Sequence, residues 1–167
     1  YAAITAHPSG VWMAVVNYPD RPDEVHALES GKLRRITTVH DEFVKDKIFS
    51  TMTGFTSKSK DGASVSNILM LPPGTSQGTK LPVVFFIHGG PVAQDTYGFD
   101  LSRQILAASG YAVCAVNYRG SSGRGLAFTK AIYGDWGNKE VLDILGAADE
   151  LERNGVADPS RMAIGGW

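Results

Sequence analysis

Four residues in the middle of the chain, His88–Pro91, combine an imidazole with two consecutive glycines directly after an apolar run. The run, Val83–Ile87, holds only β-branched and aromatic residues, which is typical of a strand buried on both faces. Glycine lets backbone N–H groups turn outward and approach a ligand closely. Preorganised N–H donors stabilise the negative charge that develops on an oxygen during acyl transfer. The sequence therefore favours His88, Gly89 and Gly90 as an oxyanion-hole loop, and an ordinary glycine turn is the alternative.

A second glycine segment, Gly165–Trp167, follows the short apolar stretch Arg161–Ile164. In α/β-hydrolases the nucleophile elbow G-x-S-x-G lies on a tight turn between the fifth strand and a helix. Counting strands along the chain places Arg161–Ile164 fifth, so we interpret Gly166 and Trp167 as the first two positions of an elbow, with the serine as the next residue. The alternative is that these are only three terminal residues. An apolar ending of this kind favours truncation.

A Gly/Ser-rich stretch, Asn117–Gly125, also follows an apolar run. It differs from a nucleotide-binding loop because its glycines have the order G-x-x-G-x-G, no helix opens on them and no G-K-[ST] follows. We therefore expect a substrate-cleft loop at the carboxyl edge of the sheet, with Tyr118, Arg119 and Arg124 as candidate lining residues. The segment Tyr133–Gly137 sets aromatic residues beside glycines, and we interpret it as an anchor for the helix that follows.

These loops need a sheet that brings their preceding strands together. Strands are predicted at Phe49–Thr56, Ser64–Leu71, Val83–Ile87, Tyr111–Val116 and Arg161–Ile164, the last after a turn at Asp158–Ser160. Helical spacing predicts helices at Asp100–Ser109 and Lys139–Asn154, the second with Val141, Leu142, Leu145, Ala148 and Leu151 on one face. This alternation predicts an α/β fold, a mostly parallel sheet with helices on both faces. Such sheets bind ligands at the carboxyl ends of their strands.

The first 45 residues follow a different pattern. Short apolar runs at Ala2–Ala6, Val11–Val16, Val25–Leu28 and Leu33–Thr38 are separated by turn signals, the longest at Tyr18–Asp23. Four antiparallel strands in about 40 residues match one β-propeller blade, and a small flanking sheet is the alternative. We therefore divide the chain into residues 1–45, the C-terminal blade of a propeller, and residues 46–167, the first half of a catalytic domain.

Composition excludes several classes of protein. The chain has 16 Lys and Arg against 17 Asp and Glu, a net charge of −1, which gives no basis for binding nucleic acid or an anionic membrane. It has no apolar stretch of the roughly 18 residues that a transmembrane helix needs. The single Cys114 lies in an apolar run and is expected to be a buried small hydrophobe. His7, His26 and His40 lack the spacing of metal ligands, so we expect neither a metal nor a cofactor.

Several motifs, in this order and spacing, resemble the prolyl oligopeptidase family of serine peptidases, and within it the acylaminoacyl-peptidase and dipeptidyl-aminopeptidase branch. They are His88–Pro91, Asn117–Gly123, Gly134–Gly137 and Asp158–Arg161 followed by Gly165–Trp167. The resemblance covers nearly the whole chain. Residues up to about 45 resemble the last propeller blade, and the rest resembles the first half of the α/β-hydrolase domain.

The resemblance implies a propeller that screens access and a Ser–Asp–His triad that cleaves short peptides by acyl transfer without a cofactor. In the family the serine follows the residue that matches Trp167, so the whole triad is expected outside this chain, which alone would be inactive. His88 precedes the nucleophile and therefore is not the triad histidine, because the triad order in this fold is Ser, Asp, His. Arg124 stands where the family often has an aromatic residue, which leaves the P1 preference open.

Three functions stay open from the sequence. They are a peptidase acting on short peptides, a carboxylesterase of the same fold, and an inert module that binds a partner without catalysis. A serine after Trp167, followed by x-Gly, would support either enzyme. The sequence indicates no compartment, and a soluble cytoplasmic, periplasmic or secreted protein is consistent with it.

Overall fold

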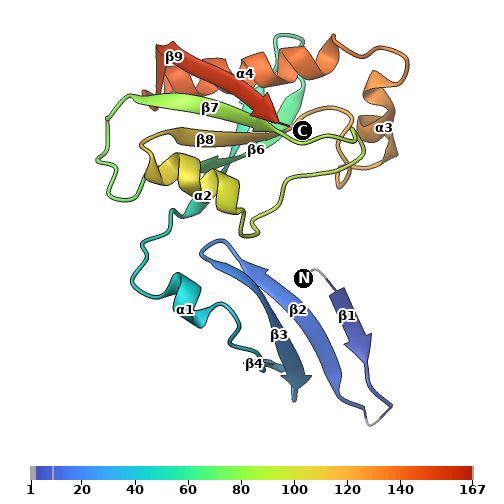
Figure 1. Cartoon of the computed structure of the whole chain (residues 1–167). Helices are drawn as coiled ribbons and strands as arrows, with labels where there is room; N and C mark the ends of the chain where they lie inside the picture. Colours follow the sequence, from blue (N-terminus) through green and yellow to red (C-terminus); the bar gives the residue numbers. More distant parts are fainter. Residues whose placement is uncertain (1–2, 9, 167) are drawn as a thin grey trace. The chain divides into compact units, whose positions relative to one another are not determined.

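The structure is a computed structural model that describes residues 3–8 and 10–166. The chain forms two compact units (Figure 1). Unit 1 runs to Phe49 and includes the separate segment Tyr97–Leu101. Unit 2 comprises Ser50–Thr96 and the rest of the chain from Ser102. Unit 1 therefore contains a short piece of chain that lies far from the rest of that unit in sequence.

Unit 1 is an antiparallel sheet of four strands in the order in which they follow along the chain: β1 (Ala3–Ala6), β2 (Trp12–Tyr18), β3 (Arg21–Glu29) and β4 (Lys32–Arg35). A short helix, α1 (Asp41–Val44), follows. Ser30 and Gly31 join β3 to β4 with φ angles of 49° and 77°, as a two-residue hairpin of the primed type requires. The predicted four-stranded arrangement is confirmed.

The long break predicted at Tyr18–Asp23 is wrong, because Arg21 already pairs with Tyr18 at the start of β3. Only Pro19 and Asp20 lie between the two strands. Proline suggested a loop because it cannot donate to a strand ladder. Here β4 pairs only with His26–Glu29, so no strand on that side requires a donor from Pro22.

The segment Tyr97–Leu101 joins unit 1 through contacts that include aromatic packing of Phe99 and a hydrogen bond to Asn17. The Phe99 ring meets that of Phe49 edge to face at 5.5 Å between centroids, and that of Phe43 at 6.4 Å. The Phe99 backbone N–H donates to Asn17 Oδ1 over 3.1 Å.

Unit 2 is built on a five-stranded sheet of order β5-β6-β8-β7-β9. Its strands are β5 (Met52–Lys58), β6 (Ser64–Met70), β7 (Leu81–Ile87), β8 (Ala112–Asn117) and β9 (Ala157–Gly166). β7 pairs in parallel with both β8 and β9, but β6 is antiparallel to β5 and to β8. The expectation of a mostly parallel sheet is therefore corrected to a mixed one. The five residues between β5 and β6 are too few for a parallel crossover.

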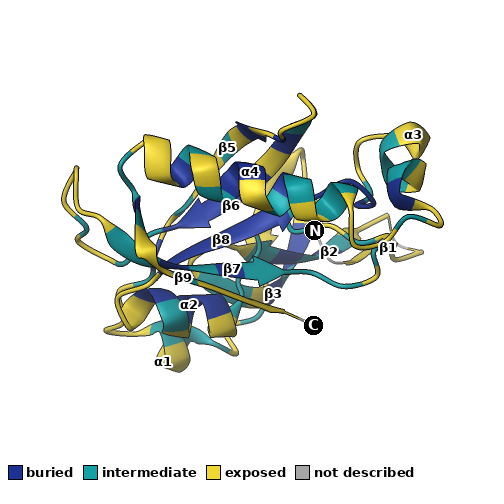
Figure 2. Cartoon of the chain, turned by 90° about the horizontal axis from the view of Figure 1, so that it is seen from above, coloured by how far each residue is buried: buried dark blue, intermediate teal, exposed yellow. Residues whose placement is uncertain are grey.

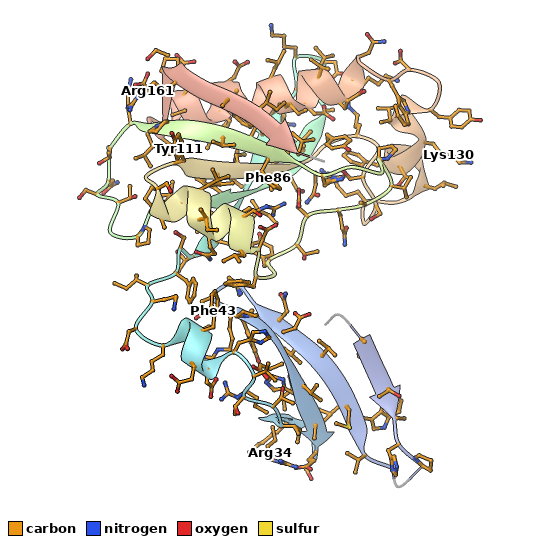
Figure 3. The ribbon with its side chains drawn as sticks, in the orientation of Figure 1. Arg34, Phe43, Phe86, Tyr111, Lys130 and Arg161 are labelled. Carbon is orange, nitrogen blue, oxygen red and sulfur yellow. The ribbon has the colours of Figure 1, made fainter. Side chains whose placement is uncertain are left out.

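Helices cover both faces of this sheet, as predicted (Figure 2). On one face α2 (Leu101–Ala108) contributes Leu106 and Ala107 to a cluster with Val113 of β8. Phe86 of β7, labelled in Figure 3, packs against the same cluster. On the other face Ala147 and Leu151 of α4 (Lys139–Arg153) pack with residues of all five strands. Two short helices, α3 (Leu126–Thr129) and η1 (Lys130–Ile132), precede α4. None of the described helices has the length and apolar character needed to cross a membrane.

The buried face of α4 differs from the predicted one. Val141 and Leu145 are 42% and 46% exposed, whereas the buried positions are Asp143, Gly146, Ala147 and Leu151. A charged residue and a glycine lie in the middle of the buried face, so apolar spacing alone misplaced its centre, although Leu142 and Ala148 are half-buried as predicted. Leu151 is the one predicted position that is fully buried.

β9 contains the turn predicted at Asp158–Ser160 as a bulge. Ala157 is opposite Leu81 and Met162 is opposite Val83, so four residues of β9 face Pro82 alone. Asp158 accepts hydrogen bonds from Ser160 and from Arg161 (labelled in Figure 3), and these bonds lower its pKa to about 2. Beyond the bulge the two strands run in register to Ile87 and Gly166. The predicted fifth strand is therefore confirmed beside β7.

Replacing Gly146 by alanine should destabilise unit 2. A Cβ at this position would lie 2.5 Å from the Lys58 carbonyl oxygen, which is backbone and cannot move cheaply. Overpacking of this kind costs about 1–3 kcal/mol, more than the roughly 1 kcal/mol that alanine gains over glycine in a helix. We expect a Tm several degrees lower for Gly146→Ala in thermal unfolding. Gly165→Ala is the control, because a Cβ there meets no atom within 4 Å. Equal Tm values for the two variants would contradict the close packing of α4.

Candidate active site

The predicted glycine loop lies where three strands of unit 2 end. β7 pairs in parallel with β8 and β9, so the carboxyl ends of all three meet at one edge of the sheet. Gly166 is opposite Ile87, the last residue before the loop, and a Cβ on Gly166 would lie 2.1 Å from the Ile87 carbonyl oxygen. Only glycine allows this approach. Trp167, the other predicted elbow residue, lies outside the described residues.

The His88 ring is held from three directions. It stacks on the Tyr118 ring, with centroids 4.6 Å apart, and its Nε2 lies 2.8 Å from Ser121 Oγ. Its Nδ1 lies 3.0 Å from the Gly89 carbonyl oxygen, which can only accept a hydrogen bond. Nδ1 therefore carries the proton, and in the neutral ring Nε2 accepts from the Ser121 hydroxyl. The Tyr118 hydroxyl in turn donates to the His88 carbonyl oxygen over 2.8 Å.

Gly90 presents a free donor. In a planar trans peptide the C=O of one residue and the N–H of the next point in opposite directions. Since the Gly89 carbonyl points to the His88 ring, the Gly90 N–H points away from it. This N–H makes no hydrogen bond with any residue that the structure describes. Gly90 has φ of 126°, and a Cβ there would lie 2.8 Å from the Val92 backbone nitrogen, so the loop requires glycine.

The loop that follows β8 supports the loop that follows β7. Asn117 accepts from the Asp95 N–H over 2.7 Å and donates to the Asp95 carbonyl over 3.0 Å. Further along, the Ser122 N–H donates to the Ala93 carbonyl over 2.8 Å. Together with the contacts of Tyr118 and Ser121 to His88, these bonds join the two loops into one structural unit.

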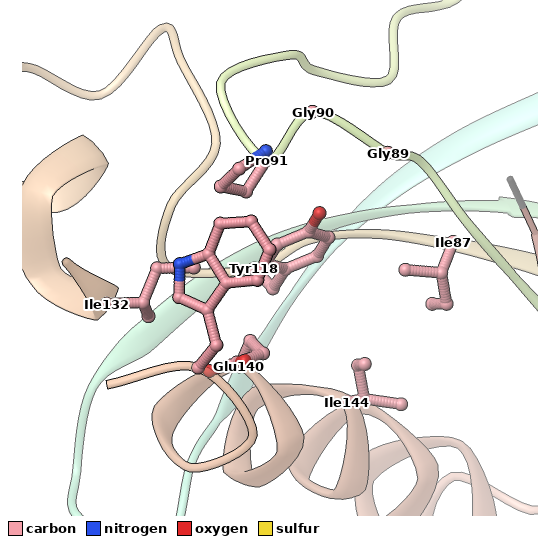
Figure 4. A pocket seen from close by; sticks show the side chains of 9 residues that line it. Ile87, Gly89, Gly90, Pro91, Tyr118, Ile132, Glu140 and Ile144 are labelled. Carbon is pink, nitrogen blue, oxygen red and sulfur yellow. The ribbon is translucent and has the colours of Figure 1, made fainter. Parts of the chain in front are cut away.

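A pocket of about 300 Å³ lies beside the glycine loop (Figure 4). Its lining is largely apolar and aromatic, with one carboxylate: Ile87, Gly89, Gly90, Pro91, Tyr118, Ile132, Trp136, Glu140 and Ile144. Of the three predicted cleft residues, only Tyr118 is in this lining. Glu140 Oε1 accepts the Gly137 N–H, and its Oε2 is buried without a partner in the described part of the chain.

The aromatic residues before α4 do not anchor that helix as interpreted from the sequence. Tyr133 is 89% exposed, and Trp136, 70% exposed, lies in the pocket wall. The start of α4 is held by polar groups instead, since Glu140 accepts the Gly137 N–H and Asn138 Nδ2 donates to Asp135.

Arg119 is buried instead of lining the pocket. Asp143 of α4, fully buried, accepts from the Arg119 backbone N–H over 2.6 Å, from Nε over 3.1 Å and from Nη2 over 2.8 Å. The Ser59 hydroxyl also donates to Asp143. On the outer side, Arg119 Nη1 donates to Asp61 over 2.6 Å, and this bond lowers the pKa of the Asp61 carboxyl. Sequence reasoning missed Asp143, and its one signal is a charge on an otherwise apolar face of a helix.

Arg124 also lies away from the pocket lining. Its Nη1 donates to the Ser64 carbonyl over 2.8 Å, and its guanidinium lies 4.8 Å from the centroid of the Phe128 ring. A surface arginine over an aromatic ring gains a modest cation–π interaction. The structure thus gives Arg124 a contact with the start of β6.

Neither the Ser121–His88 pair nor Cys114 is arranged as a nucleophile. Ser121 is fully buried, and His88 Nδ1 donates to a backbone carbonyl where a triad histidine would meet a carboxylate. Cys114 is fully buried in β8, and burial raises the pKa of its thiol far above the usual range. Within the described residues, no cluster of three or more His, Cys, Asp or Glu side chains could hold a metal ion.

Comparisons with known proteins give one consistent family. Residues 97–167 match the model of the prolyl oligopeptidase family. The uncharacterized peptidase YuxL of Bacillus subtilis is 35% identical over 157 residues, which are 93% of this chain and 24% of that protein. Dipeptidyl aminopeptidase BIII of Pseudoxanthomonas mexicana is 37% identical over 114 residues, 65% of this chain and 16% of that protein.

Solved structures agree with these sequence matches. Acylaminoacyl peptidase of Pyrococcus horikoshii superposes with a TM-score of 0.86 at 28% identity, covering 98% of this chain and 26% of that one. The chain thus spans about a quarter or less of the length of the relatives it matches.

The geometry predicts one tautomer for His88. The uncharged ring should carry its proton on Nδ1, because the Gly89 carbonyl accepts from that atom. Long-range ¹H–¹⁵N correlation spectra of protein labelled with ¹⁵N-histidine distinguish protonated from unprotonated ring nitrogens, and the loss of one signal set in His88→Asn assigns it. Protonation on Nε2 alone would mean that the Gly89 carbonyl is not fixed by this ring.

Proposed function

Because the chain belongs to the prolyl oligopeptidase family, we propose that it is about one quarter of a serine peptidase that hydrolyses short peptides by acyl transfer. The names of its relatives, dipeptidyl aminopeptidase and acylaminoacyl peptidase, suggest substrates cleaved close to the amino terminus of a peptide. Aminopeptidase or oligopeptidase action is therefore the activity that we assign to the whole protein.

The observation that carries this proposal is the unpaired Gly90 N–H at the end of β7. Gly90 is exposed and lines the pocket, so its N–H is accessible to a ligand that binds there. In acyl transfer the carbonyl oxygen of the substrate becomes an oxyanion that needs such a donor. Gly90 N–H would supply one donor, and the residue after the nucleophile would supply the other. Pro91 has no N–H, so it can stiffen the loop but cannot donate.

The position of Gly166 supports the same assignment. Beside β7, β9 ends with Gly166 directly opposite Ile87, so a nucleophile elbow that continues from β9 would lie next to the glycine loop. We propose that Gly166 and Trp167 begin that elbow, that the next residue is the nucleophilic serine, and that the Asp and His of the triad follow further along. His88 is assigned to the support of the oxyanion loop, with no part in proton transfer.

Unit 1 has a sheet face that suits a propeller blade. Trp12 is opposite Leu28, and Leu28 is opposite Leu33, so these three side chains share one face across three strands. All three are exposed, as is Ile4 of β1. Blades of a propeller bury such faces against their neighbours, and isolated apolar patches of this kind are uncommon. We therefore propose that residues 1–45 form one blade of a propeller that screens access to the active site.

Covalent labelling tests the proposed class of enzyme. The whole protein should react with a fluorophosphonate probe at one serine and should hydrolyse an aminoacyl p-nitroanilide, because both reactions need the activated nucleophile. The 167-residue chain by itself should do neither. Turnover of p-nitrophenyl esters without anilide cleavage would identify a carboxylesterase, and the absence of both would identify an inert binding module. Labelling of the 167-residue chain at Ser121 or another of its own serines would contradict the assignment of the triad.

Substitution of Gly90 tests the oxyanion donor. Gly90→Ala forces a side chain against the Val92 nitrogen and turns the N–H away, which should lower kcat by about 10²-fold or more with a smaller change in KM. Gly78→Ala is the matched control, since Gly78 has the same kind of positive φ, 82°, but precedes β7. Both variants should keep the circular dichroism spectrum of the wild type. A kcat for Gly90→Ala within about twofold of the control would remove Gly90 from the oxyanion hole.

A further inference from the structure

We propose that Asp143, buried in α4, is a positioning residue that sets the direction of the Gly90 N–H through the loop after β8. This inference rests on the proposed oxyanion role of Gly90. Asp143 is not in the pocket lining, so it acts through other residues. Three connections join Asp143 to the loop: Asp143 contacts Arg119, the neighbours of Arg119 contact His88, and His88 contacts Gly89, next to Gly90.

The first connection fixes the backbone at Arg119. Asp143 Oδ2 accepts the Arg119 backbone N–H over 2.6 Å, and Oδ1 accepts from the guanidinium over 2.8 Å. One carboxylate therefore holds both the main chain and the side chain of the same residue. Arg119 Nη2 also donates to the Lys139 carbonyl over 3.2 Å, so Arg119 is bonded to the first residue of α4 as well. Asp61 contacts only the outer side of the guanidinium.

The second connection places His88. Tyr118 and Ser121 lie one residue before and two residues after Arg119, so the fixed backbone determines where their side chains start. The Tyr118 hydroxyl holds the His88 carbonyl at 2.8 Å, and its ring stacks on the imidazole. Ser121 Oγ meets the imidazole Nε2 at 2.8 Å. Both contacts are made by groups that are buried or nearly so, which limits their alternative conformations.

The third connection orients the donor. His88 Nδ1–H donates to the Gly89 carbonyl, and planarity of the peptide then directs the Gly90 N–H to the opposite side. A rotation of the imidazole would release the Gly89 carbonyl and allow this peptide to turn. Asp143 thus determines the orientation of an N–H that it does not touch. A carboxylate suits this position because a neutral side chain would leave the buried Arg119 charge with Asp61 alone.

The test separates positioning from simple loss of folded protein. In the whole protein, Asp143→Asn keeps the shape of the side chain but removes its charge. The readouts are kcat, KM and the inhibition constants of a peptide aldehyde, which forms an oxyanion-like adduct, and of the corresponding peptide amide, which does not. Inhibition constants do not depend on the fraction of enzyme that is folded, so a merely structural role would leave both unchanged.

We expect Asp143→Asn to lower kcat and the affinity for the aldehyde by about 10- to 100-fold, because small misplacements of a catalytic group have effects of this size. KM and the inhibition constant of the amide should stay within about twofold. Asp149→Asn, an exposed acid on the same helix, is the matched control and should leave all four values unchanged. An aldehyde constant within twofold of the wild type, or equal weakening of aldehyde and amide, would overturn the proposal.

Two further variants keep the result decisive. If Asp143→Asn does not fold, Ser121→Ala removes the contact with His88 Nε2 alone, and an unchanged aldehyde constant in that variant overturns the proposal. Gly90→Ala distinguishes a failure of the role of Asp143 from a failure of the oxyanion role of Gly90. If Gly90→Ala weakens the aldehyde and Asp143→Asn does not, only the role of Asp143 fails. If Gly90→Ala has no effect, the oxyanion assignment itself fails.

Discussion

The described site depends on one backbone group, the Gly90 N–H in the loop after the buried strand β7, which stays unpaired. In the loop after β7 three of the four carbonyl groups accept hydrogen bonds: that of His88 from Tyr118, that of Gly89 from His88, and that of Pro91 from Ala93. The Gly90 N–H has no such partner within the described residues. The loop is thus held in place by its acceptors, which leaves a donor available to a ligand.

Support of this kind has to come from outside the loop, because four residues that include two glycines and a proline cannot fix themselves. The parallel register of β7 and β8 places the loop after β8 alongside it. Asn117 binds both backbone groups of Asp95, and Tyr118 and Ser121 bind His88. Ligand-binding loops on α/β sheets are positioned by rigid strands in this way. Here polar side chains at and after the end of β8 fix the loop that follows its neighbour, β7.

Local signals in the sequence predicted most of the elements. β7 and β8 are short apolar runs bounded by proline, glycine or polar residues, and the Ser30–Gly31 hairpin has turn residues at the required positions. These features depend on neighbours a few residues away. The start of β3 could not be predicted, because whether Pro22 is tolerated depends on how far β4 extends beside it. Pairing between strands decided that boundary, and the propensity of proline did not.

Of the candidate site, only the glycine loop could be predicted from the sequence. There the proposed function requires a particular residue type, glycine. Arg119 suggested a cleft residue because it stands in a polar, glycine-rich loop. Its partners, Asp143 and Asp61, are 24 and 58 residues away in the chain, so nothing nearby in sequence indicates that its charge is buried. Asp143 was missed for the converse reason, since a helix normally turns a carboxylate to solvent. A buried charge is stable only with its partner, so each residue explains the position of the other, and neither can be interpreted alone.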